Sequence, residues 1–174
     1  MSHIKIIEYR DEHQQYFEML NRAWIEKFFT MEPSDIEMLT KPRQSLLDKG
    51  GAILMAEFNG VIAGTVALKK ISEGIFEFTK MAVDAKYRRL GIAEYLSYGS
   101  FLKAKELNAK SIILYSNSIL KGAILLYEKL GFIHGPVINS GYVRSDVKME
   151  IPIEEAVERA NTYFNQKKNF SPVK

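Results

Sequence analysis

The stretch from Lys80 to Leu96, KMAVDAKYRRLGIAEYL, constrains the fold more than any other part of the chain. The apolar, β-branched and aromatic run 75–83, which overlaps its start, predicts a strand. The spacing of the apolar residues after Gly91 predicts a helix. A helix start binds anions through its free N–H groups and its dipole, and Gly91, Ala93 and the basic loop KYRR suit a phosphate there. We therefore predict a strand–loop–helix unit in which Gly91 either opens a phosphate site or only eases the turn from strand to helix.

Composition and charge restrict the class of protein. The chain has 174 residues, 47% hydrophobic and 26% charged, which is the size and make-up of one soluble globular domain. Its net charge of +3 is too small to indicate a nucleic-acid partner. The absence of cysteine excludes a disulfide framework and a thiol nucleophile. The three histidines lack the spacing of a metal site.

No segment approaches the roughly 18 consecutive apolar residues of a membrane span. The N-terminal sequence MSHIKIIEYRDE also lacks the pattern of a signal peptide. We therefore expect a cytoplasmic protein that binds neither a membrane nor a metal.

Periodicity and turn residues predict a mixed α/β domain. Strands are expected at 3–9, 52–58, 61–68, 75–83, 111–115, 132–138 and 142–151, and helices at 16–28, 34–41, 91–107, 120–130 and 154–165. Asn59-Gly60 predicts a tight hairpin between the second and third strands, and Asn139-Ser140-Gly141 predicts a turn between the last two. The tail 167–174 should be mobile.

Two motifs identify a resemblance to a known family. Arg88-x-x-Gly91-x-Ala93 resembles the pyrophosphate-binding motif of the GNAT superfamily of acyl-CoA-dependent N-acyltransferases, and Tyr127-x-x-x-Gly131-Phe132 resembles a second signature of that superfamily. The resemblance implies the GNAT fold over 1–151, with a strongly twisted mixed sheet of about seven strands flanked by helices. The region 152–174 is then a C-terminal helical extension. The implied cosubstrate is acetyl-CoA, with coenzyme A as product and no metal.

The resemblance also implies a set of residues that bind the cofactor. The backbone of Met81 would hold the thioester oxygen and that of Val83 the pantetheine arm, at a bulge that separates this strand from the next parallel one. Many relatives have an asparagine where this chain has Leu120, so Asn117 either replaces it or caps the following helix. The full implied set is Met81, Ala82, Val83, Arg88, Arg89, Leu90, Gly91, Ile92, Ala93, Glu94, Asn117, Ala123 and Tyr127.

Tyr127 and Glu77 are the candidate catalytic residues. A helix stop explains Gly131 and Phe132 without any chemistry, but it does not explain Tyr127, which in the family protonates the leaving thiolate. Glu77 is an acidic residue in an apolar strand, at a position that resembles the general base of some family members. The alternatives for Glu77 are a solvent-facing residue or a partner of Lys80.

The acceptor site is expected between the N-terminal helices and the last hairpin. Candidates are Trp24, Phe28, Phe29, Glu32, Tyr142 and Arg144. Arg144 either clamps a substrate carboxylate or lies on the surface paired with Asp146 or Glu150.

Two functions follow from these residues. The first is transfer of an acetyl group from acetyl-CoA to a primary amine of a small molecule or peptide, by direct attack in a ternary complex, in a monomer or homodimer. The alternative is a sensor or scaffold module that binds coenzyme A without turnover. A nucleotide-binding Rossmann domain is excluded because no G-x-G-x-x-G follows the first strand.

Overall fold

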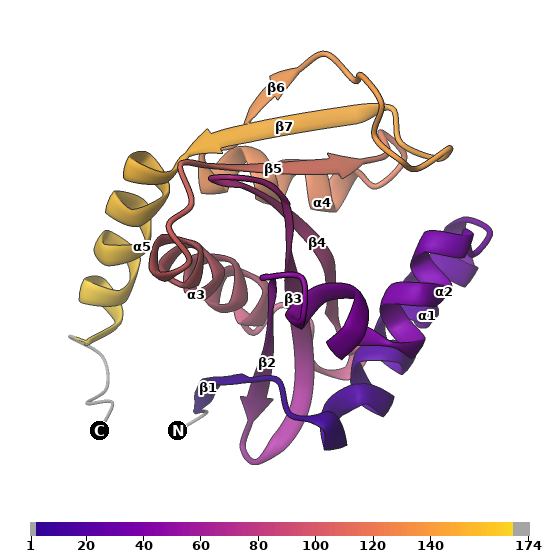
Figure 1. The fold of residues 1–174 in the computed structure, drawn as a ribbon. Coiled ribbons are helices and arrows are strands. Elements are labelled where there is room, and N and C mark those ends of the chain that lie inside the picture. Colours follow the sequence, from indigo (N-terminus) through magenta and orange to yellow (C-terminus); the bar gives the residue numbers. More distant parts are fainter. Residues whose placement is uncertain (1–2, 169–174) are drawn as a thin grey trace.

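A single seven-stranded sheet organises the chain in the computed structural model, which describes residues 3–168 (Figure 1). Its strands are β1 (Ile4–Glu8), β2 (Ala52–Phe58), β3 (Val61–Ser72), β4 (Ile75–Val83), β5 (Ser111–Ser116), β6 (Ile133–Gly135) and β7 (Val147–Pro152). Their order in the sheet is β1-β2-β3-β4-β5-β7-β6. The β4–β5 pair is parallel and the other pairs are antiparallel, so the predicted mixed α/β fold is confirmed.

Helices cover both faces of the sheet (Figure 1). They are α1 (Gln14–Phe28), α2 (Pro33–Thr40), α3 (Ile92–Glu106), α4 (Lys121–Leu130) and α5 (Ile153–Lys168), with short turns at Asp11–His13, Arg43–Leu47 and Ala85–Tyr87. No helix between residues 3 and 168 combines the length and the apolar character that spanning a lipid bilayer requires.

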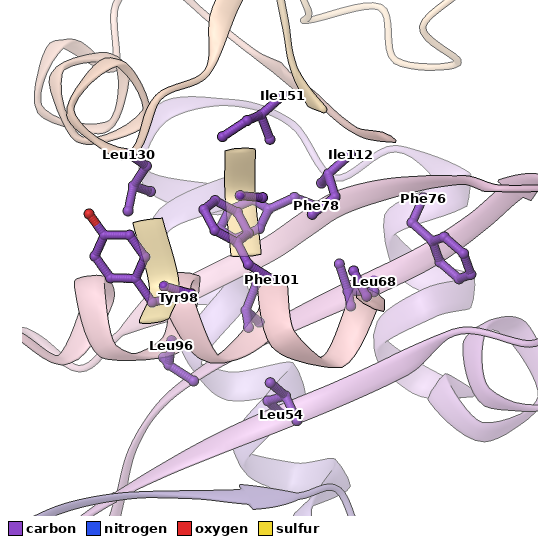
Figure 2. Packing of buried hydrophobic residues seen from close by; sticks show 14 of the residues in the cluster. Leu54, Leu68, Phe76, Phe78, Leu96, Tyr98, Phe101, Ile112, Leu130 and Ile151 are labelled. Atoms are coloured by element: carbon purple, nitrogen blue, oxygen red, sulfur yellow. The ribbon is translucent and has the colours of Figure 1, made fainter. Parts of the chain in front are cut away.

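Alternation along the central strands creates two hydrophobic cores. Successive side chains of a strand point to opposite faces, so Leu54 joins the core under α3 and its neighbour Met55 joins the core under α1 and α2. Figure 2 shows the first core, in which Leu96 and Phe101 of α3 lie against the sheet. α5 adds to this core, and Tyr163 stacks on Tyr98 with ring centroids 4.4 Å apart.

The sheet opens between β4 and β5. The two strands pair only from Ile75–Ser111 to Glu77–Ile113. Beyond that point β4 contains a bulge against β3, where Lys80 has a positive φ of 54°. A bulge bends its strand, so the end of β4 departs from β5 and its polar backbone groups on that side become available to a ligand. This is the separation that the resemblance implied.

Several predicted element boundaries were wrong; β3, for example, continues to Ser72 and does not end at Leu68. The last two strands are shorter than expected, because 136–146 forms a long loop in which the N–H groups of Val143 and Arg144 bind the Glu32 carboxylate. α2 begins at Pro33 and not at Ser34, since proline suits the first helical position and Glu32 is the N-cap. α5 continues to Lys168, so the first two residues of the predicted mobile tail are helical; 169–174 lie outside the described residues.

Candidate active site

A groove of about 810 Å³ lies between the end of β4 and α4, and α1 forms its third wall. β4 and its following loop contribute Met81–Ala85, and α4 contributes Ala123, Leu126 and Tyr127. Of the residues implied to bind the cofactor, the groove is lined by Met81, Ala82, Val83, Arg88, Ala93, Ala123 and Tyr127. The sequence did not indicate that Met19, Leu20 and Ala23 of α1 form the third wall, because their apolar spacing is also that of any core helix.

The start of α3 has the features of an anion site. Gly91 is the N-cap residue with a φ of 84°, which favours glycine. Apart from the adjoining backbone, no atom of residues 3–168 lies within 4 Å of where its side chain would begin. Tyr95 N–H bonds to Gly91 O at 3.0 Å, which leaves the N–H groups of Ile92, Ala93 and Glu94 for a ligand. Arg89 and Leu90 are exposed on the loop beside them.

A second, smaller pocket of about 50 Å³ adjoins this groove. Trp24, Met81, Leu120 and Tyr127 line both cavities. Trp24, Phe29, Tyr142 and Arg144, four of the six predicted acceptor residues, line the small pocket. Phe28 lines the groove, and Glu32 binds Arg144 from behind the pocket.

Tyr127 stands where the groove and the pocket meet. Its ring is held edge-on by Phe78, with centroids 5.8 Å apart, and by Phe132 at 6.2 Å. Burial raises the pKa of Tyr127 to about 12. The phenol is therefore protonated at neutral pH and its position is fixed, as a proton donor to a group in the groove requires.

Two of the residues that line the small pocket, Lys80 and Arg144, belong to a cluster of buried charges. Arg144 Nη1 and Nη2 bind the fully buried carboxylate of Asp35 at 2.5 and 2.8 Å, and Lys80 Nζ pairs with the same carboxylate at 2.9 Å. Glu32 accepts from Arg144 Nη1 at 3.1 Å. Burial alone would raise the pKa of Asp35, but hydrogen bonds from Arg144 and the charge of Lys80 outweigh it and lower the pKa to about 2.

The surface pairing of Arg144 with Asp146 or Glu150 was therefore wrong. The side chain of Arg144 is only 13% exposed, because it lies near the rings of Tyr142, Phe29 and Trp24, at 4.9, 5.8 and 5.9 Å from their centroids. Asp146 instead accepts hydrogen bonds from Ser118.

Glu77 is buried, with 2% of its surface exposed, so it is not solvent-facing. Tyr142 donates a hydrogen bond to Glu77 Oε2 at 3.2 Å and accepts one from Lys80 at 3.5 Å. Lys80 forms its ion pair with Asp35, not with Glu77. Burial raises the pKa of Glu77, and the charge of Lys80 opposes this rise. Glu77 lies outside the residues that line the pocket, and Tyr142 connects it to that pocket.

A sequence model of the acetyltransferase (GNAT) family matches residues 11–132, which include the groove, the anion site and Tyr127. The chain belongs to this family.

Individual relatives agree with the GNAT assignment. Human N-acetylaspartate synthetase is 30% identical over 121 residues, which are 68% of this chain but only 38% of that protein. An acetyltransferase of the GNAT family from Staphylococcus aureus Mu50 has a TM-score of 0.78 at 21% identity, over 87% of this chain and 99% of the other. Mutant forms of the spermidine/spermine N-acetyltransferase SpeG from Vibrio cholerae have a TM-score of 0.70 at 18% identity, over 90% and 98%.

Asn117 connects two segments beside the small pocket. Its Oδ1 accepts from Ile119 N–H at 2.9 Å and its Nδ2 donates to Arg144 O at 2.6 Å. The N-cap of α4 is Leu120, so Asn117 does not cap that helix. Asn117 lines the small pocket and not the groove.

Sequence reasoning did not identify Asp35 as part of the GNAT site, and it treated Lys80 only as a partner of Glu77. The available signal was a lysine in the apolar run IFEFTKMAV, since a buried ammonium needs a buried counter-charge. Nothing in the sequence places that counter-charge on α2.

Proposed function

We propose that the chain transfers the acetyl group of acetyl-CoA to the primary amine of a small acceptor by direct attack in a ternary complex. The observation that carries the proposal is the position of Tyr127 in the shared wall of a cofactor-sized groove and a small acceptor pocket. A cosubstrate in the groove and an acceptor in the pocket would meet at this phenol.

The groove fits a nucleotide with a long flexible arm. The start of α3 offers free N–H groups to phosphates, with Arg88 and Arg89 beside them. The open edge of β4 offers backbone groups to the amides of the arm, as an added strand would. Arg89, Leu90, Gly91, Ile92 and Glu94 are assigned to this role together with the groove-lining residues. Acetyl-CoA supplies the activated acetyl group when it is bound.

Two groups of the chain then act on the thioester. The N–H of Met81 would hold the thioester oxygen as negative charge develops on it. Tyr127 would give its proton to the sulfur as the C–S bond breaks and the C–N bond forms. The thiol of coenzyme A has a pKa of about 8.5, below the pKa of about 12 of Tyr127, so this transfer alone is uphill and is completed when the phenolate recovers a proton from the acceptor nitrogen.

Protons must also leave the acceptor. A primary ammonium with a pKa of about 10.4 is neutral in roughly one molecule in a few thousand at pH 7, and only the neutral amine attacks. We assign the first proton to Glu77, through the Tyr142 hydroxyl that already donates to it. The second proton, lost when the amide forms, replaces the one given by Tyr127, so one proton is released to water for each acetyl group transferred.

The names of the relatives indicate two acceptor chemistries. One relative is named for an acetylated amino acid, aspartate, and another acts on spermidine and spermine. Both acceptors contain a primary amine, and they differ in length and in charge.

Free-thiol release from acetyl-CoA, measured across a panel of primary amines with mass detection of the acetylated product, tests the proposal. We expect thiol and acetylated amine in equal amounts. Binding of acetyl-CoA with no product from any amine would contradict it and would favour the sensor or scaffold function.

A further inference from the structure

The charged groups that line the small pocket all have one sign. Lys80 and Arg144 line it, and among residues 3–168 no aspartate or glutamate does. The three nearby acids, Glu32, Asp35 and Glu77, bind Arg144, Lys80 or Tyr142 from behind the pocket wall. An acceptor in this pocket therefore meets cations and aromatic rings, and the acids reach it only through those groups.

One edge of the Arg144 guanidinium group already binds a carboxylate, and a second edge has no hydrogen-bond partner among residues 3–168. Its Nη1 and Nη2 atoms together hold Asp35, and the other Nη1 hydrogen goes to Glu32. The Nε–H and the second Nη2–H, which lie on one edge of a guanidinium group, have no hydrogen-bond partner among residues 3–168. Every fully buried side-chain nitrogen or oxygen in those residues has a partner. The free Nε–H must therefore reach solvent, and Arg144 lines the pocket.

This edge has the geometry that a carboxylate requires. Two parallel N–H donors match the two oxygens of a carboxylate, and a charge-assisted pair of this kind is among the stronger hydrogen-bonded contacts. The orientation of the edge is fixed, because Asp35 and Glu32 hold one side of the guanidinium, three aromatic rings surround it, and Asn117 binds the backbone carbonyl of Arg144.

We infer that the acceptor carries a carboxylate next to its amine, and that the free edge of Arg144, assisted by Lys80, binds this carboxylate. The substrate class is then a small amino acid. The inference rests on the proposed function, because it takes the small pocket as the acceptor site. A volume of about 50 Å³ has room for on the order of four water molecules, which agrees with an amino acid and leaves little space for a long chain.

The charged residues that line the pocket are unsuitable for a polyamine. Its second ammonium would lie in a pocket whose charged lining is Lys80 and Arg144, and no acid of residues 3–168 lines that pocket to compensate it. The nearby acids already pair with Lys80, Arg144 or Tyr142, so a second ammonium would find no direct counter-charge in the pocket within the described part of the chain, and leaving it unpaired there is unfavourable. The pocket therefore selects against polycationic acceptors as well as for anionic ones.

The test compares L-amino acids with their carboxamides, which keep the amine and the side chain but lack the negative charge. With saturating acetyl-CoA, we expect kcat/KM to be at least about tenfold higher for the amino acid of the best pair than for its carboxamide, and spermidine to be a poor substrate. The adjacent carboxylate makes the amine more basic, so intrinsic reactivity favours the carboxamide and cannot produce this result. Equal or higher efficiency with carboxamides or spermidine would overturn the inference and leave the acetyltransferase proposal intact.

Arg144→Lys tests the residue assignment. It keeps the positive charge but loses the second pair of parallel donors, so the ratio between the amino acid and its carboxamide should fall toward one. The matched control is Arg43→Lys, in which an exposed arginine paired with Asp11 is changed away from the pocket; the ratio should stay at the wild-type value. An unchanged ratio in a folded Arg144→Lys variant would contradict the role of this edge.

A binding measurement separates this inference from the proposed function. Calorimetric titration of the protein–coenzyme A complex with the same pairs reports the carboxylate site even if no amine is acetylated. Binding of the amino acid, with at least about tenfold weaker binding of its carboxamide, supports the inference. Equal binding of both overturns it. Absence of turnover with every amine contradicts only the proposed function.

Discussion

Tyr142 donates a hydrogen bond of 3.2 Å to Oε2 of Glu77, and this contact places a phenol between the buried carboxylate and the pocket that Tyr142 lines. Glu77 itself does not line that pocket. If Glu77 is the general base, its proton must pass through the hydroxyl of Tyr142. We therefore expect the two residues to act together in proton transfer, and mutation of each can test this.

Tyr142→Phe should lower kcat by about 10²-fold, because it removes the hydroxyl and keeps the ring near Lys80 and Arg144. Glu77→Gln should have a similar effect, and the double variant should be no slower than either single one, since both remove the same path. Tyr115→Phe is the control, because Tyr115 also lines the pocket. Additive losses in the double variant would show that the two residues act independently.

The pH profile gives a second test of Glu77. Burial raises its pKa, so turnover of bound substrate should rise as pH passes through this raised value and then become constant. In Glu77→Gln the plateau should be lost, and the rate should keep climbing to about pH 9–10 as the acceptor itself loses its proton. A variant with the wild-type profile and rate would rule out Glu77 as the base.

Tyr127→Phe should lower kcat by about 10²–10⁴-fold. The affinity for acetyl-CoA should remain nearly unchanged, because the phenyl ring still packs on Phe78 and Phe132. Single-turnover kinetics combined with a binding titration separates the two effects. A loss of less than about threefold would reject the role as acid.

Acetyl-CoA should raise the melting temperature of the protein, because it binds only the folded state. In Gly91→Val this shift should disappear, since the side chain would project into the open space at the start of α3. Gly60→Val is a matched control. Gly60 has a φ of 82° against 84° for Gly91, both positions are free of neighbours within 4 Å among residues 3–168, and Gly60 lies in the β2–β3 hairpin. Both variants place valine at a positive φ and share the resulting backbone strain. Only the Gly60 variant should keep the rise in melting temperature that acetyl-CoA causes.

The buried charges should also control stability in acid. The pKa of Asp35 falls from an ordinary 3.8 to about 2 in the folded protein. A lowered pKa contributes stability that is present above pH 4 and is lost as pH falls from 4 to 2, here about 2–3 kcal/mol. Asp35→Asn leaves Lys80 and Arg144 without this counter-charge and should destabilise the fold by about 3–5 kcal/mol at pH 7. It should also remove this part of the acid dependence.

Urea unfolding as a function of pH measures both effects. Asp11→Asn is the control, because Asp11 pairs with Arg43 on the surface and such pairs contribute about 0–1 kcal/mol. Equal losses in the two variants would contradict a special role of Asp35.

Much of the fold could be predicted because its signals are local. Asn59 and Gly60 both adopt the positive φ that their hairpin requires. The run 75–83 and Gly91 define a strand and a helix start from neighbouring residues alone. Tyr127 could be placed because helical spacing ties it to Gly131, which ends α4 with a φ of 101°.

The acceptor side could be predicted only in part because its contacts are distant in sequence. Arg144, Asp35 and Lys80 come from a loop, α2 and a strand bulge, and each would be unstable in its buried position without the others. The pattern near Arg144 favoured a strand over 142–151 with a surface arginine. The carboxylates of Glu32 and Asp35 instead bind residues 143 and 144 in a loop, so the last hairpin is shorter than predicted.

Initial velocities measured while both acetyl-CoA and the best acceptor are varied test the central claim most directly. Direct attack in a ternary complex predicts double-reciprocal lines that intersect, because both substrates must be bound before the first product leaves. The absence of cysteine from the sequence agrees with this order. Parallel lines, together with an acetylated protein after incubation with acetyl-CoA alone, would show a covalent intermediate and would contradict the account.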